Sequence, residues 1–294
     1  MKPSSQDVGT YDGLFSGAAR LGLLCGVLEV PWTSVAEYVA VFSERLKDYF
    51  ELSVDPSIQA LGVMTKGEGK PYAYRITRFM EEHGIQEETL RQFLVRARYF
   101  EYRNIFFKVE ADGRGLQEFS TYFRRRPSLE VAHAILADGG VDADGVGLME
   151  AVAEVLQKKS VHFVGAAATR SGQVQEKIYF SQPDTVDSWD RLHTAVRLCG
   201  LSDSEWAPMA GIREHLVDRT AFLSIGFSNG EVVPGVKIDV HNVPQAAIQA
   251  LISDDVIADR ADLPRSVMGR STHSYVGFRL EPGKPIRVKT YALG

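Results

Sequence analysis

The chain has 294 residues, of which 45% are hydrophobic and 24% charged, so it can bury a full core as one large domain or two small ones. A net charge of −5 and the lack of a long basic segment argue against nucleic-acid and membrane-surface partners, because phosphate groups attract a basic stripe. Cys25 and Cys199 lack metal-ligand spacing, and the N-terminus lacks a basic-then-apolar signal segment. We therefore predict a cytoplasmic protein without disulfides.

The N-terminal part of the chain is predicted to be helical after a polar, flexible segment at residues 1–12. Apolar residues recur at helical spacing in 14–27 and again in 31–52, where Pro31 is placed to open the second helix. The apolar face of this second helix must cover another element of the structure.

Five later stretches have the pattern of β-hairpins, in which two runs of strand-forming residues flank a turn. Helical segments alternate with them, and a spacing of about 45–60 residues is typical of an internal repeat. The predicted hairpins span residues 60–78, 104–125, 160–181, 219–243 and 272–293. The predicted helices among them span 76–84, 86–102, 127–140, 147–159, 183–201 and 244–252.

Ten antiparallel strands in one sheet would leave two exposed edges unless the sheet closes. We therefore predict an α+β fold in which a ten-stranded antiparallel β-barrel of five hairpins is surrounded by α-helices. This barrel is expected to form a single domain over residues 1–294 and to be a monomer. A barrel wider than eight strands has more interior than side chains easily fill, so we expect a lumen.

Alternation along the hairpins predicts which side chains face that lumen. In the second strand of 160–181, Lys177 and Tyr179 share one face, whereas Ile178 and Phe180 share the opposite, apolar face. The apolar face is expected to pack on helices, which turns the polar face inward. The same reasoning places these further cations and phenols inward: Arg75, Tyr122, Lys237, Arg287, Lys289 and Tyr291.

Several cations that converge in one cavity require a highly charged anion, and a diphosphate supplies that charge while offsetting their desolvation. Tyrosine rings present electron-rich faces that stabilise a carbocation, and their hydroxyls donate hydrogen bonds to phosphate oxygens. This combination is what ionisation of an allylic diphosphate beside an aromatic acceptor needs.

Four stretches contain Arg75, Tyr122, Lys177, Tyr179 and Lys237 in chain order: YAYRITR (72–78), EADGRGLQEFSTYF (110–123), VHFVGAAATRSGQVQEKIYFS (161–181) and SIGFSNGEVVPGVKIDVHNVP (224–244). The pattern resembles the aromatic prenyltransferases of the αββα (ABBA, prenyltransferase-barrel) family, in particular the group of aminocoumarin and naphthalene prenyltransferases. The resemblance covers nearly the whole chain from about Leu21. Its specificity lies in the order of the five hairpins, since the family has no short invariant signature.

The resemblance implies a diphosphate-binding site. Arg75 falls where one branch of the family has a metal-binding Asp and the aminocoumarin branch has an Arg. Arg287 falls on a family lysine of the last strand, and Tyr291 on a family tyrosine. The other residues assigned to this site are Lys177, Tyr179, Lys237 and Lys289.

Two positions depart from the family pattern. Glu118 stands where a phosphate-binding Lys is usual, so the second hairpin either contributes Tyr122 or Arg124 instead or uses Glu118 for the acceptor. Asp239 stands where the indole branch has a Tyr, which puts the shielding of the carbocation on that side in doubt.

The acceptor ring must lose a proton, and Glu118, Asp239, His162 or the released diphosphate is the candidate base. For His162, the plainer alternative is a core histidine satisfied by a neighbour. Ala166, with Ala168 and Gly226, is expected to leave room for a substrate. The predicted substrate pocket is lined by Tyr122, Ser120, Val164, Ala166, Phe222 and Ser224.

We therefore predict a transferase of secondary metabolism that moves a dimethylallyl or geranyl group from its diphosphate to an electron-rich aromatic small molecule. The alternative is a non-catalytic barrel that binds an anionic aromatic metabolite. No metal or other cofactor is predicted to be required, because Arg75 would supply the charge that Mg²⁺ supplies elsewhere. The alternative is that Glu118 and Asp239 form a metal pair.

Overall fold

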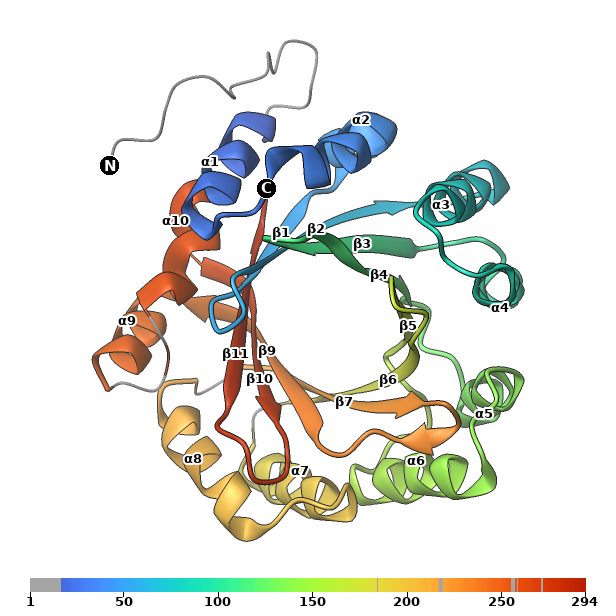
Figure 1. Cartoon of the computed structure of the whole chain (residues 1–294). Coiled ribbons are helices and arrows are strands. Elements are labelled where there is room, and N and C mark those ends of the chain that lie inside the picture. Colours follow the sequence, from blue (N-terminus) through green and yellow to red (C-terminus); the bar gives the residue numbers. More distant parts are fainter. Residues whose placement is uncertain (1–16, 184, 217–218, 255–256, 258, 271) are drawn as a thin grey trace.

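A closed antiparallel β-barrel surrounded by helices organises the computed structural model, which describes residues 17–183, 185–216, 219–254, 257, 259–270 and 272–294 (Figure 1). The predicted flexible segment 1–12 lies outside the described residues. Neighbouring strands pair in the order β6-β5-β4-β3-β2-β1-β11-β10-β9-β7, and pairing of β6 with β7 closes the ring. The predicted ten-stranded barrel is confirmed. A two-residue strand, β8, extends the edge of β7.

The strands fall into five hairpins in chain order. Their bounds are β1 (Glu51–Asp55), β2 (Ala60–Gly67), β3 (Ile105–Asp112), β4 (Gly115–Phe123), β5 (Phe163–Thr169), β6 (Val174–Gln182), β7 (Ala221–Ser228), β8 (Glu231–Val232), β9 (Val236–Pro244), β10 (Thr272–Leu280) and β11 (Arg287–Leu293).

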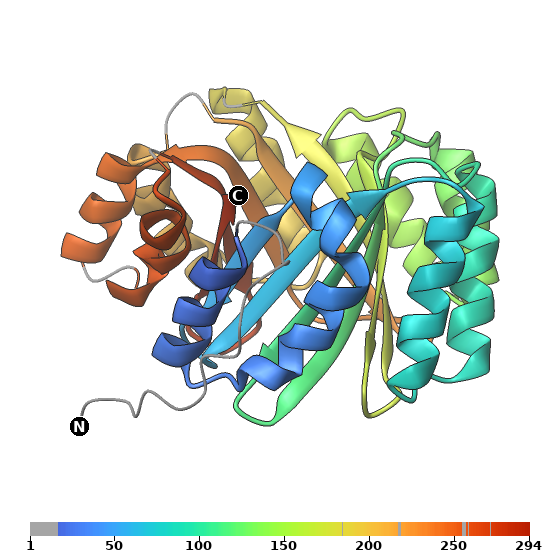
Figure 2. The same ribbon diagram turned by 90° about the horizontal axis from the view of Figure 1, so that it is seen from above.

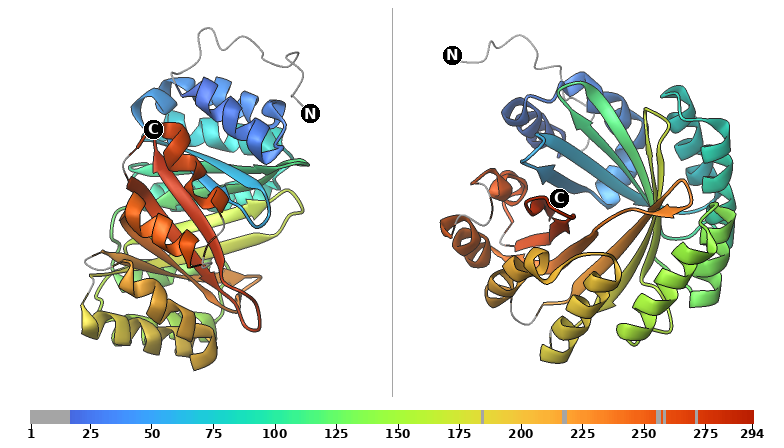
Figure 3. Two further views of the ribbon diagram at one scale, coloured as in Figure 1. Left: turned by 90° about the vertical axis from the view of Figure 1, so that its left-hand side faces the viewer. Right: turned by 60° about the horizontal axis from the view of Figure 1, so that its bottom comes forward.

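The helices form an outer layer around the barrel, as Figure 2 shows from a second direction. Helices α1 and α10 pack on each other, and α10 also packs on β1 and β11, where the first and last hairpins join (Figure 3). The sequence patterns do not predict α8 or α10. The helix bounds are α1 (Ala18–Leu28), α2 (Trp32–Asp48), α3 (Lys70–Glu82), α4 (Glu87–Tyr99), α5 (Leu129–Asp138), α6 (Ala143–Val155), α7 (Val186–Leu198), α8 (Asp203–Glu214), α9 (Gln245–Ser253) and α10 (Leu263–Met268).

The first hairpin lies nearer the N-terminus than predicted. Its strands are β1 and β2, whereas the stretch predicted as its second strand is the helix α3. Tyr72, Ile76 and Phe79 are buried at helical spacing, and this period prevails over the alternation that the sequence analysis assumed. Arg75 consequently lies on the exposed face of α3 and not in the lumen, so its prediction as a diphosphate ligand is wrong.

The outer face of the barrel carries the apolar core. Tyr38 and Phe42 of α2 pack against Phe79 of α3 and Phe107 of β3, with ring centroids 4.9–6.0 Å apart. The Tyr38 hydroxyl also donates a 2.7 Å hydrogen bond to the Phe107 carbonyl. These contacts hold β3 in register, which fixes the direction of its lumen-facing neighbour Lys108.

The register of β5 differs from the prediction by one residue. Residues directly opposite in an antiparallel pair share a face. Val164 pairs with Ile178 on the outer face, and Ala166 pairs with Glu176 on the same face. The predictions that Val164 and Ala166 line the substrate pocket are therefore wrong.

The residue that β5 contributes to the lumen cavity is Phe163, which pairs with lumen-facing Tyr179. The β5 sequence is apolar from Phe163 to Ala168, so its own alternation could not orient it. Ala168 shares the outer face of Val164 and Ala166 because it pairs with Val174.

Among the described helices, none is both long and apolar enough to cross a membrane.

Candidate active site

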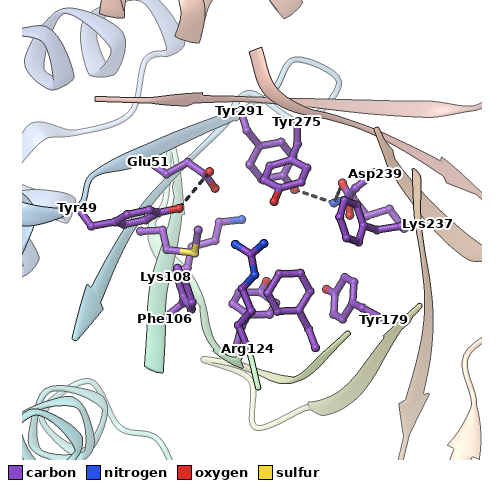
Figure 4. Close-up of a pocket in the computed structure, with 14 residues that line it drawn as sticks. Tyr49, Glu51, Phe106, Lys108, Arg124, Tyr179, Lys237, Asp239, Tyr275 and Tyr291 are labelled. Carbon is purple, nitrogen blue, oxygen red and sulfur yellow. Dashed lines mark hydrogen bonds and ion pairs between the residues drawn. The ribbon is translucent and has the colours of Figure 1, made fainter. Parts of the chain in front are cut away.

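The barrel lumen holds two adjoining cavities that share Lys108, Tyr122, Tyr179, Lys237 and Tyr291. Counting the space that is open to solvent, one of them, here called the aromatic half, has a volume of about 670 Å³, and the other, the cationic half, about 1000 Å³. The aromatic half is also lined by Tyr49, Glu51, Met64, Phe106, Arg124, Phe163, Phe222, Asp239 and Tyr275 (Figure 4). The charged residues that line the cationic half are Asp55, Lys108, Glu110, Glu118, Lys177, Lys237, Arg279, Arg287 and Lys289.

The cationic half has an excess of positive charge, since its described lining carries six cations and three carboxylates. Arg287 pairs with Asp55 at 2.7 Å. Glu110 accepts hydrogen bonds from both Lys108, at 2.8 Å, and Lys289. These contacts partly offset the cost of burying the cations.

Lys177 has no hydrogen bond or ion pair with the described residues, and it lies opposite Gly165 and Gly226 in the neighbouring strands. Its charge nevertheless acts on Glu118, whose Oε1 accepts a 2.6 Å hydrogen bond from the Ser120 hydroxyl. Burial alone would raise the pKa of Glu118, but the attraction of Lys177 and the other lysines outweighs burial and lowers it. Glu118 is thus a carboxylate held ionised among cations.

Tyrosines and a lysine form the boundary between the two halves. The Lys237 ammonium donates a 2.7 Å hydrogen bond to the Tyr291 hydroxyl and pairs with Asp239 at 2.5 Å. The rings of Tyr122 and Tyr179 meet edge to face with centroids 6.0 Å apart. Burial holds the pKa of Tyr179 and Tyr291 well above the ordinary value, so both hydroxyls stay protonated and can donate hydrogen bonds.

The wall of the aromatic half is a run of touching rings. Phe163 lies 6.2 Å from Phe222, Phe222 lies 5.8 Å from Tyr275, and Tyr275 lies 6.1 Å from Tyr291, each distance joining ring centroids. Planar π faces in this arrangement suit an aromatic ligand and exclude water from it.

A buried carboxylate, Glu51, faces the aromatic half from β1. Its Oε2 accepts hydrogen bonds from the Ser274 hydroxyl at 3.2 Å and the Tyr49 hydroxyl at 3.4 Å, and its Oε1 has no such bond from the described residues. Burial raises the pKa of Glu51 to about 7, although these hydrogen bonds and Lys108 act in the opposite direction. A carboxyl group with this pKa can take up and release a proton near neutral pH.

His162 does not reach either cavity. Its ring packs against Phe163 and Phe222 at centroid distances of 4.6 and 4.9 Å, and it is these two rings that line the aromatic half. Burial, with the charge of Arg124, lowers the pKa of His162 to about 4. The prediction that places His162 at the reacting ring is therefore wrong, because His162 lines neither cavity and its lowered pKa makes it a weak base.

The structure brings most of the predicted site residues together. Ser120 lies on the inward face of β4, where its hydroxyl donates a hydrogen bond to Glu118. Arg75, Val164, Ala166 and His162 lie outside the lumen. The predicted residues that line it are Glu118, Tyr122, Lys177, Tyr179, Phe222, Ser224, Lys237, Asp239, Arg287, Lys289 and Tyr291.

Sequence reasoning missed the first hairpin's share of the site. Glu51 and Asp55 belong to β1, and the helical pattern of 31–52 ran into that strand. The alternation of Glu51, Ser53 and Asp55 with Leu52 and Val54 is the signal that could have found it. Other lining residues that the sequence analysis did not assign include Tyr49, Met64, Phe106, Lys108, Glu110, Phe163, Tyr275 and Arg279.

Comparison with known proteins gives matches in structure but not in sequence. No protein-family model matches the chain, and none of the curated proteins does. The prenyltransferase PriB, in a ternary complex with L-tryptophan and dimethylallyl thiolodiphosphate, superposes with a TM-score of 0.68 at 15% identity over 94% of each chain. The chain has the fold of the aromatic prenyltransferases.

Two further prenyltransferase structures agree. A 6-dimethylallyl tryptophan synthase matches with a TM-score of 0.67 at 14% identity, over 95% of this chain and 96% of its own. The 5-dimethylallyltryptophan synthase of Streptomyces coelicolor matches with a TM-score of 0.58 at 13% identity, over 93% of this chain and 95% of its own. The predicted prenyltransferase barrel is confirmed as a fold, and the aminocoumarin and naphthalene subgroup stays a prediction.

Proposed function

We propose that this prenyltransferase barrel is an aromatic prenyltransferase, which transfers a dimethylallyl or geranyl group from its diphosphate to an electron-rich aromatic small molecule. The observation that carries this proposal is the meeting of the cationic and aromatic halves in one lumen, at a boundary built from Tyr122, Tyr179, Lys237 and Tyr291. A diphosphate in the cationic half and an acceptor ring in the aromatic half would place the allylic carbon of the prenyl group between them.

The cationic half would hold the diphosphate and stabilise its charge as it leaves. Lys177 can bind the diphosphate without giving up another contact, because it has no ion pair among the described residues. Arg287 and Lys289 would instead share their donors between phosphate oxygens and the carboxylates of Asp55 and Glu110. Fixed cations aimed at a developing negative charge are the most effective form of electrostatic stabilisation.

The tyrosines at the boundary would screen the allylic cation from water. Their ring faces stabilise positive charge, and their protonated hydroxyls can donate to the diphosphate. The C–O bond to the diphosphate breaks with both electrons on oxygen, and a carbon or heteroatom of the acceptor forms the new bond to the allylic carbon.

Glu51 would take the proton that the acceptor loses. It is the carboxylate of the aromatic half that no lysine or arginine holds in an ion pair among the described residues, whereas Asp239 is bound to Lys237 and Glu118 lies in the cationic half. The released diphosphate is the alternative proton acceptor.

We also propose that the protein's own cations make magnesium unnecessary for turnover. Arg75 cannot supply this charge, but the six cations that line the cationic half can. Activity is therefore expected to survive excess EDTA. Loss of activity in EDTA and its return with Mg²⁺ would favour a metal pair of Glu118 and Asp239 instead.

Mass spectrometry of candidate acceptors tests the proposed function. Phenols, indoles and phenazines are incubated with dimethylallyl or geranyl diphosphate, and we expect at least one acceptor to gain one prenyl group in place of hydrogen. Binding of an acceptor and a diphosphate without any gain in mass would favour the non-catalytic barrel.

A further inference from the structure

Two glycines of the lumen wall, Gly62 of β2 and Gly277 of β10, leave space that lysine side chains occupy. A Cβ atom on Gly277 would lie 2.6 Å from Lys237 Cε and 2.9 Å from Lys237 Nζ. A Cβ atom on Gly62 would lie 3.1 Å from Lys108 Nζ and would come closer still to Lys108 Cε. Carbon atoms in contact are normally about 3.5–4.0 Å apart, so an alanine at either position would force the lysine to move.

Strand pairing turns both glycines toward the lumen. Gly277 lies opposite Asp239 and Lys289 and itself lines the cationic half. Gly62 lies opposite Glu110, which lines the same half. Residues directly opposite in an antiparallel pair share a face. A side chain at either position would therefore enter the cavity and not the helix layer.

The backbone does not explain why these positions hold glycine. Gly62 and Gly277 are buried inside regular strands, and neither is among the glycines with a positive φ. A glycine in a strand interior weakens the strand and often marks a place where another group approaches closely. Room for a lysine is the reason that the structure offers at both positions.

The two lysines meet at the ring of Tyr291, on the boundary between the two halves (Figure 4). The Lys237 ammonium lies 4.9 Å from the ring centroid, and the Lys108 ammonium lies 5.9 Å from it. Each ammonium is paired with one carboxylate, Lys237 with Asp239 and Lys108 with Glu110. Two cations at one ring repel each other, so an anion that contacts both relieves this repulsion as it binds.

We propose that Gly62 and Gly277 are positioning residues of the cationic half. Because they lack side chains, the two lysines reach the boundary and together raise the affinity of the lumen for a diphosphate. The effect on diphosphate affinity rests on the proposed function, whereas the positions of the lysines follow from these contacts alone.

A crystal structure of ligand-free Gly277→Ala tests the positioning without any substrate. We expect the Lys237 side chain to move and to lose its 2.7 Å hydrogen bond to the Tyr291 hydroxyl. A Lys237 that keeps this hydrogen bond would overturn the inference. If Gly277→Ala does not fold, Gly277→Ala/Lys237→Ala should fold, because the stem that the new methyl group strikes is gone. Failure of both variants to fold would also count against it.

Binding of inorganic diphosphate, measured by calorimetry, tests the consequence in a double-mutant cycle. Gly277→Ala should weaken binding roughly tenfold in the wild-type protein, but by less than about twofold in Lys237→Ala, where no ammonium is left to displace. Gly62→Ala should show the same dependence on Lys108→Ala. Gly211→Ala in α8 is the control and should bind like the wild type, because its Cβ would meet no heavy atom of the described residues within 4 Å outside its own helix backbone.

Glycine and lysine changes whose effects simply add would show that the glycines do not act through the lysines. Tight binding by the wild type together with this additive pattern would contradict the positioning role and leave the proposed function intact. A wild-type protein that binds no diphosphate would contradict the proposed function, and the crystal structure of Gly277→Ala would still decide whether the glycine holds Lys237 in place.

Discussion

Two buried carboxylates of the lumen show how differently its halves are built. In the cationic half, Glu110 is held by Lys108 and Lys289, and their attraction outweighs burial and lowers its pKa well below the ordinary value. In the aromatic half, Glu51 receives only hydroxyl hydrogen bonds, and burial raises its pKa to about 7. Glu51 is the more deeply buried of the two and has no lysine partner in the described part of the chain, so burial and the neighbouring cations together set the difference. One half therefore fixes negative charge, and the other can accept a proton.

The largest loss of turnover is expected when Glu51, the proposed proton acceptor of the aromatic half, is replaced. Glu51→Gln keeps the shape but removes the basic group, and a general base contributes about 10²–10⁴-fold to the rate. Because the carboxyl group is protonated below its pKa of about 7, wild-type kcat should rise as pH increases through about 7 and then level off. In Glu51→Gln this rise should disappear. An unchanged pH profile in the variant would assign the proton to the released diphosphate.

The cationic half is tested by Lys177→Ala. This change removes an unpaired cation that we expect to contact the leaving group, and loss of one such interaction costs about 10²–10³-fold in kcat. Steady-state kinetics with the prenyl diphosphate as the varied substrate measures the effect. If kcat of the variant stays within about threefold of the wild-type value, Lys177 makes at most a minor contact and is excluded from the reacting site.

The two faces of β6 should respond in opposite ways. Ile178 is fully buried on the outer face, so Ile178→Ala should lower the free energy of unfolding by about 2–5 kcal/mol. Lys177→Ala, one residue away on the lumen face, should leave that free energy nearly unchanged. Denaturant unfolding of both variants measures the contrast. A stable Ile178→Ala and an unstable Lys177→Ala would mean that the register of β6 is wrong by one residue.

This contrast also explains which parts of the structure could be predicted from the sequence. In β6, Ile178 and Phe180 alternate with Lys177 and Tyr179, so the apolar face is defined locally even though Glu176 also lies on it. In β5, both faces are apolar, and only its pairing with β6 determines that Phe163 points inward. The orientation of such a strand depends on its neighbours and is not contained in its own pattern.

The first hairpin shows a second limit. The residues around Arg75 alternate over a few positions, but the longer helical period of Tyr72, Ile76 and Phe79 decides the structure because it buries three large side chains against α2 and the barrel. The strand containing Glu51 directly follows a helix whose apolar period continues to its end. The chain gives no strong break there, so the sequence pattern places Glu51 in the helix and not in β1.

The smallest effect is expected for Arg75. Because its side chain is exposed on α3, outside the lumen, Arg75→Ala should change the unfolding free energy by no more than about 0.5 kcal/mol and should not affect turnover. Parallel kinetic and unfolding measurements provide the check. A large loss of activity would show that α3 contributes to the site after all.

The division of the lumen into two halves with separate tasks is tested most directly by the binding of inorganic diphosphate, measured by calorimetry in wild type, Lys177→Ala and Glu51→Gln. Loss of one charge-assisted contact should weaken binding roughly tenfold or more in Lys177→Ala. Glu51→Gln should bind diphosphate as tightly as the wild type, because Glu51 lines only the aromatic half. Equal weakening in both variants, or no weakening in Lys177→Ala, would contradict the division.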